Sequence, residues 1–159
     1  MCDLYSPAKK YFGDINYLIL LQPAHIHKRK RKTMTKKQLF TLEYAVRCSP
    51  AILYNFLSTP AGLQEWFADL VNERDKLFVF SWNNTEEKAE VVDAEQDKFI
   101  RFHWLNSPKE EYFEFRIDKT EITNQTVLII KDFAEKKEIK DQTQLWEYQV
   151  KELLHRLGN

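Results

Sequence analysis

The spacing of apolar residues predicts an amphipathic helix at the carboxyl end of the chain, from Asp141 to Asn159. At about 100° per residue, four apolar side chains share one narrow arc of the helical wheel. They are Trp146, Val150, Leu153 and Leu157, with Leu154 at the edge of the arc. We expect Asp141 as the N-cap, with Gln144 in a variant of the capping box, and Gly158 as a left-handed C-cap.

Upstream of this helix, apolar and polar residues alternate with a period of two, which predicts strands. The alternation is clearest in Lys37–Cys48 and in Glu111–Asp118. In the second segment one face carries Phe113, Phe115 and Ile117, and the other carries Tyr112, Glu114 and Arg116. We expect Glu114 to lie on the solvent face. Further strands are expected at Leu70–Arg74, Lys76–Trp82, Glu87–Glu95 (solvent-facing), Lys98–Leu105 and Thr126–Phe133.

Two Ser/Thr-Pro pairs follow the first strand and predict two short helices in tandem. Ser49-Pro50 and Thr59-Pro60 each combine an N-cap residue with proline at the first helical position. Strands joined by short loops must be antiparallel neighbours, and a long meander twists and curls. The predicted fold is therefore α+β, with a curved antiparallel sheet of six or seven strands wrapped around the long C-terminal helix.

The charge distribution divides the chain of 159 residues at about position 38. Residues 1–38 contain nine Lys/Arg and two Asp/Glu, whereas residues 39–159 contain fifteen and twenty-two, although the net charge is zero. The basic run His27–Lys32 is open to three interpretations: a phosphate-binding arm, a disordered tail, or residues upstream of a true start at Met34. We expect the folded domain to span residues 39–159.

Composition also limits the class of protein. No apolar run approaches the length of a membrane span, and two cysteines without a CxxC spacing favour a reducing compartment. We therefore expect a cytoplasmic protein. Motifs for nucleophilic catalysis, phosphate binding and metal binding are absent from the sequence, so we expect no cofactor, no metal and no catalytic residue. Glu114 and Asp132 could share a pocket as an acid–base pair. The acidic domain argues against binding to nucleic acid.

Aromatic residues make up 14% of the chain and offer a stronger argument. They would either fill a dense core or line a cavity between the sheet and the terminal helix, with a few polar groups for orientation. The candidate lining residues are Trp66, Phe80, Trp82, Phe102, Trp104, Phe113, Phe115, Trp146 and Val150. Arg101 and His103 would be polar contacts if their strand face points inward, which the period of two does not decide.

The order of these elements resembles the helix-grip fold of the START-like superfamily. The phrase Thr59–Phe67 (TPAGLQEWF) is similar to the elbow of homologues of the activator of the ninety-kilodalton heat-shock-protein ATPase. The phrase Ile130–Glu135 (IKDFAE), with Leu145-Trp146, resembles small START-like proteins of Bacteroidota-type bacteria. Glycine is scarce, and Asp-Phe-Ala-Glu stands where many relatives have a glycine.

The resemblance implies a range of functions, because relatives include lipid carriers, cyclases and chaperone partners. We expect a hydrophobic or amphipathic, lipid-like small molecule to bind in the cavity without catalysis. The alternatives are a protein-interaction domain that serves a chaperone, and an enzyme of the cyclase or hydrolase type.

Overall fold

The computed structural model describes residues 36–159. The predictions for the basic run His27–Lys32 and for a start at Met34 lie outside the described residues.

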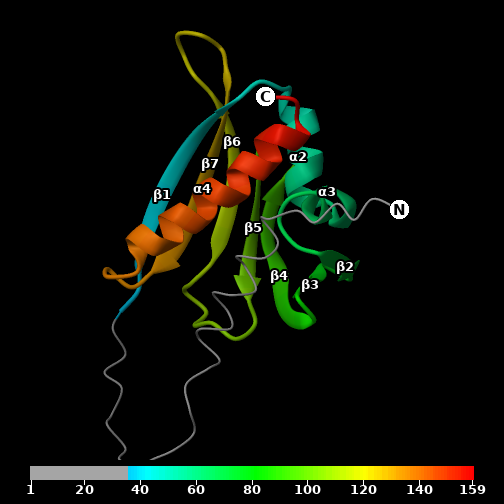
Figure 1. Ribbon diagram of the computed structural model, residues 1–159, viewed down its shortest axis with the longest axis vertical. Helices are drawn as coiled ribbons and strands as arrows, with labels where there is room; N and C mark the ends of the chain where they lie inside the picture. Colours follow the sequence, from blue (N-terminus) through cyan, green and yellow to red (C-terminus); the bar gives the residue numbers. More distant parts are fainter. Residues whose placement is uncertain (1–35) are drawn as a thin grey trace, which may run out of the picture.

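Seven antiparallel strands form one curved sheet in the spatial order β1-β7-β6-β5-β4-β3-β2 (Figure 1). Strands β2 to β7 follow one another as a meander, and β1 completes the sheet by pairing along β7. The predicted α+β fold is thus confirmed. The strand bounds are β1 Gln38–Val46, β2 Leu70–Arg74, β3 Leu77–Trp82, β4 Thr85–Glu95, β5 Phe99–Trp104, β6 Phe113–Lys119 and β7 Thr126–Ala134.

The hairpin turns depend on Asn and Asp in a chain with only three glycines. Asn83 and Asn84 have φ values of 46° and 65° between β3 and β4. Two consecutive residues with positive φ give a turn whose twist matches that of the flanking strands, and Asn tolerates this conformation better than most residues. Asp75 and Lys76 repeat the arrangement between β2 and β3.

The two predicted short helices are α2 (Pro50–Ser58) and α3 (Pro60–Gln64). Both predicted N-caps are confirmed. The Ser49 hydroxyl accepts a hydrogen bond from the Ile52 N–H at 3.4 Å, and the Thr59 hydroxyl accepts one from the Gly62 N–H at 3.0 Å. The proline after each cap has no N–H that would need a partner there.

The terminal helix α4 (Ile139–Arg156) crosses the concave face of the sheet (Figure 1). Its predicted start is wrong: Glu138 is the N-cap and forms no side-chain capping bond, so Asp141 lies in the first turn. There its negative charge interacts favourably with the helix dipole. The C-cap residue is Leu157, and Gly158 directly after it has the predicted left-handed conformation, with φ 75° and its N–H donating to the His155 carbonyl. The N–H of Asn159 donates to Leu154, which completes a Schellman motif.

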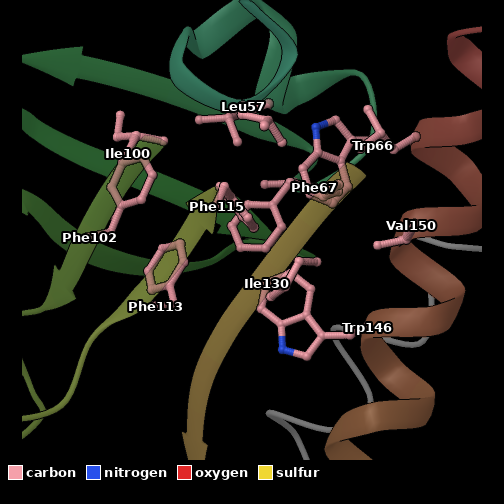
Figure 2. Close-up of a cluster of buried hydrophobic side chains, with 14 of the residues drawn as sticks. Leu57, Trp66, Phe67, Ile100, Phe102, Phe113, Phe115, Ile130, Trp146 and Val150 are labelled. Atoms are coloured by element: carbon pink, nitrogen blue, oxygen red, sulfur yellow. The ribbon is translucent and has the colours of Figure 1, made fainter. Parts of the chain in front are cut away.

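The core lies between α4 and the sheet and consists mainly of aromatic rings (Figure 2). Phe67, just after α3, is 2% exposed and occupies the centre of this cluster. Its ring stacks on Trp146 of α4 at 5.8 Å and on Phe113 of β6 at 6.0 Å. The chain segment of α2 and α3 thus places the Phe67 ring where it contacts both α4 and the sheet.

Glu114 corrects one expectation. It lies on the predicted polar face of β6, but it is fully buried rather than solvated. Nε of Arg101 and Nε of Arg116 donate to its carboxylate at 2.8 and 3.0 Å, and Lys131 Nζ lies at 3.2 Å. Three long cationic side chains from β5, β6 and β7 therefore cover this carboxylate on the outer face.

Candidate functional site

A pocket of about 260 Å³ opens between the sheet and the amino-terminal half of α4. The pocket lies at the end of the sheet where β3, β5 and β7 finish and β4 begins. These strands line it with residues near those ends. The lining consists of Lys37, Phe67, Trp82, Glu87, Trp104, Glu111, Tyr112, Asp132, Phe133, Ala134, Glu138, Gln142, Leu145 and Trp146.

Six aromatic residues dominate the pocket wall, and hydrogen bonds fix two of them in place. The indole N–H of Trp82 donates to the Phe67 carbonyl at 2.7 Å, which ties β3 to the segment after α3. The indole N–H of Trp146 donates to Asp132 Oδ2 at 2.9 Å, which ties α4 to β7. Buried indole N–H groups need such partners, so the two rings have little freedom to collapse into the pocket.

Asp132 is the most constrained polar residue of the site. Its Oδ2 also accepts from Gln142 Nε2 at 3.3 Å, and its Oδ1 accepts from the Phe133 N–H at 2.7 Å. Burial raises the pKa of this carboxyl above its ordinary value, although these donors and the more distant Lys37 charge act in the opposite direction. In each of these hydrogen bonds an oxygen of Asp132 is the acceptor, and both of its oxygens take part.

Three other carboxylates border the pocket. Glu111 forms an ion pair with Lys37, whose Nζ lies 2.7 Å from Oε2. Glu87, at the start of β4, has neither an ion pair nor a side-chain hydrogen bond among the described residues, and burial raises the pKa of its carboxyl. Glu138 stands at the rim as the N-cap of α4. Charge and aromatic surface thus occur together in this pocket.

A second hollow of about 580 Å³ lies at the opposite ends of β3, β4 and β5, beside the elbow of α2 and α3. None of its lining residues comes from α4, so this hollow is outside the space that the helix and sheet enclose. Its lining residues include Tyr54, Pro60, Phe78 and Ile100.

The nine apolar residues that the sequence predicted to line a cavity fall into two groups in the structure. Three of them line the pocket, namely Trp82, Trp104 and Trp146. Six are packed into the buried core beside it, namely Trp66, Phe80, Phe102, Phe113, Phe115 and Val150. Arg101 and His103 are not in the pocket lining: Arg101 covers Glu114 on the outer face, and His103 Nδ1 lies 2.8 Å from the Glu111 carbonyl oxygen.

The proposed pairing of Glu114 and Asp132 does not occur, because the two residues face opposite sides of the sheet. Glu114 pairs with Lys131 across β6 and β7, and the next residue along β7 necessarily points to the other face.

Sequence reasoning missed several of the residues that line the pocket. Phe67 stands beside Trp66 in the elbow phrase, but its central position depends on the turn after α3. Glu87 was expected on a solvent-facing strand, yet it shares an inward face with the fully buried Ala89. The alternation of Glu87, Ala89 and Val91 in β4 places these residues on one face, but it does not show that this face points inward.

In the described part of the chain, no helix is long and apolar enough to cross a membrane.

Comparisons with known proteins agree with this architecture. The sequence model of the START-like superfamily domain matches residues 34–159. The solution structure of BfR322 from Bacteroides fragilis is 41% identical, with a TM-score of 0.57; the match covers 74% of this chain and 89% of that protein. No match was found among curated protein sequences.

More distant structures share the fold. The Aha1 dimer from Colwellia psychrerythraea is 17% identical with a TM-score of 0.64, over 76% of this chain and 96% of that one. MLL2253 from Mesorhizobium loti is 15% identical with a TM-score of 0.63, over 76% and 97%. The resemblance to the START-like superfamily that the sequence suggested is thus confirmed, and the chain belongs to that superfamily.

Proposed function

We propose that the protein binds a small amphipathic molecule in the pocket between the sheet and α4, without catalysing a reaction on it. The observation that carries this proposal is a pocket with six aromatic residues in its wall and a carboxylate, Asp132, held at one position by an indole N–H. Apolar walls with a few fixed polar groups are typical of small-molecule sites. The START-like fold commonly binds hydrophobic ligands, which agrees with this proposal.

The size of the pocket narrows the class of ligand. At about 260 Å³ it is slightly smaller than the usual range for ligand pockets, which begins at about 300 Å³. The space beneath it is filled by the buried rings of Phe80, Phe102, Phe113 and Phe115. A molecule with one or two rings therefore fits the pocket better than a long acyl chain. The class of ligand proposed here is thus narrower than the lipid-like molecules expected from the sequence.

Chemical extraction tests the proposal. The full chain, purified gently from its native host, is extracted with organic solvent and the extract is examined by mass spectrometry. We expect one small molecule in an amount that approaches that of the protein. An empty extract from repeated preparations would contradict binding.

A pocket-filling variant links the molecule to this site. Ala134 is 5% exposed and lines the pocket from β7, so Ala134→Phe, or the milder Ala134→Leu, should reduce the recovered amount severalfold. Ala45→Phe is the matched control, because Ala45 is an exposed strand residue on β1 and is not part of the lining. An unchanged yield from both folded Ala134 variants would show that the molecule binds elsewhere.

A further inference from the structure

We propose that the ligand is an amine, whose ammonium group lies against the carboxylate of Glu87 while its apolar body contacts the tryptophan rings and Asp132 accepts a hydrogen bond from a second donor of the ligand. This inference rests on the proposed function and names the chemical class of the ligand. It follows from the charges in the pocket, from their existing partners and from the nature of the walls.

The charge of the lining is strongly unbalanced. Among the described residues, four carboxylates line the pocket and Lys37 is the only basic residue of the lining. The ion pair between Lys37 and Glu111 already uses that positive charge. Glu87, Asp132 and Glu138 therefore face the pocket without a cationic partner within ion-pair distance among the described residues. An anionic ligand would meet this negative potential and be repelled.

Glu87 is the pocket carboxylate that most clearly lacks a partner for its charge among the described residues. Its backbone pairs with Phe80 in the β3–β4 ladder, which directs the side chain to the concave face beside the pocket. Removing a carboxylate from water costs free energy unless a cation or hydrogen-bond donors replace the water. No described side chain supplies either group to Glu87. A ligand ammonium would supply both a positive charge and N–H donors.

Asp132 points to the same ligand chemistry. Its two oxygens accept bonds from Trp146, Gln142 and Phe133, so the carboxylate is held in place as an acceptor. A carboxylate has about four lone-pair sites, and three are used in this way. The remaining site can accept a hydrogen bond from a ligand donor, whereas it cannot donate to a ligand acceptor.

The tryptophan rings complete the argument. The faces of indole rings attract cations, and an aromatic enclosure is a common way to bind an ammonium group. Trp82 and Trp104 lie with ring centroids 6.3 Å apart, inclined at 56°, and Trp146 approaches from α4. These rings also provide the apolar surface that the hydrocarbon part of an amine would cover.

Three probes of nearly equal shape and different charge test the inference. They are 2-phenylethylamine, 2-phenylethanol and phenylacetate, titrated into the full chain at pH 7.5. Binding is followed by calorimetry and by quenching of tryptophan fluorescence. We expect the amine to bind about tenfold more tightly than the alcohol, and phenylacetate to bind more weakly than either.

Substitution of Glu87 assigns the selectivity to the pocket. Glu87→Gln keeps the size of the side chain and removes its charge, so it should reduce the amine affinity about fivefold and leave the alcohol affinity unchanged. Glu86→Gln is the matched control, because Glu86 is the preceding residue of β4, is exposed and is not in the lining. It should leave both affinities unchanged.

The possible failures are distinguishable. An alcohol that binds as tightly as the amine, or an amine affinity that Glu87→Gln does not change, overturns the inference and leaves the proposed function standing. Binding by none of the three probes also overturns the inference, and the extraction experiment then decides the proposed function alone.

Discussion

Two glutamates show how neighbouring groups decide the role of a residue. Glu114 and Glu87 both lie on strands and are both partly or fully buried. Glu114 is surrounded by Arg101, Arg116 and Lys131, so its charge is neutralised within the protein. Glu87 has no such partner among the described residues and borders a pocket. The first is a structural carboxylate, whereas the second is available to a ligand.

Glu114→Gln should lower the free energy of unfolding by about 2 kcal/mol at pH 7, because three partly exposed cations lose the carboxylate that they share. Burial alone would raise the pKa of Glu114, but hydrogen bonds from Arg101 and Arg116 and the Arg101 charge together lower it. A lowered pKa stabilises the fold above the unfolded-state value of 4.5, and this contribution is lost as the pH falls below it.

Urea unfolding of the wild type and of Glu114→Gln, between pH 3 and 7, measures this effect. The difference between the two proteins should shrink as the pH falls. Asp118→Asn is the control, since Asp118 lies on the same face of β6 but is exposed. Equal stability of wild type and Glu114→Gln at pH 7 would contradict the structural role of this cluster.

At the scale of elements, the elbow of α2 and α3 determines where Phe67 and Trp66 enter the core. The Thr59 hydroxyl donates to the Asn55 carbonyl at 2.7 Å and accepts from Gly62, so a single residue ends α2 and begins α3. Trp66 then donates its indole N–H to the Phe56 carbonyl at 3.0 Å. The two helices approach so closely that only glycine fits at position 62.

Gly62→Ala should destabilise the protein by about 3 kcal/mol. A Cβ at this position would lie 2.2 Å from the Asn55 carbonyl oxygen and 2.6 Å from the Phe56 Cα, and backbone atoms cannot easily move away. Gly158→Ala is the comparison: it has φ 75° but no atom within 4 Å, so only conformational strain of about 1 kcal/mol is expected. Thermal unfolding of both variants checks this, and equal losses would contradict the steric explanation.

At the scale of the whole molecule, the C-terminal segment is attached to the rest of the domain at separate points along its length, and the pocket lies beside one of them. Near its carboxyl end, Arg156 of α4 approaches Glu65, and Asn159 accepts a hydrogen bond from the Arg47 N–H at 2.6 Å. At the other end, Trp146 and Gln142 donate to Asp132. The pocket lies beside these last contacts, and a ligand there would touch both layers.

Ligand binding should therefore stabilise the whole domain. At a ligand concentration of one hundred times Kd, linkage predicts about 2.7 kcal/mol, which corresponds to an increase in Tm of roughly 8 °C. The measurement is a thermal unfolding series with whichever of the three phenyl probes binds most tightly. Ala134→Phe should remove the shift and Ala45→Phe should retain it; a shift that persists in a folded Ala134→Phe protein would contradict binding in this pocket.

The repeat of apolar residues determined most of the fold without reference to tertiary structure. A period of two in β1 and β6 and a period of 3.6 in α4 describe local geometry, and the Ser-Pro and Thr-Pro pairs are local signals of helix starts. Short connections between strands then leave little choice but an antiparallel meander. The start of α4 was misjudged, because Glu138 begins the helix without the side-chain bond that a sequence pattern can reveal.

The pocket was decided only by the tertiary structure. Alternation shows which residues share a strand face, but not which face is covered by α4, and so it could not separate Glu87 from the solvated carboxylates of β4. Nor could it show that Glu114 and Asp132 lie on opposite faces, since this depends on the register of β6 and β7. The sequence showed which strand rings share a face; the distance between helix and sheet decided which of them fill the core and which border a space, because that distance depends on all of the side chains packed between them.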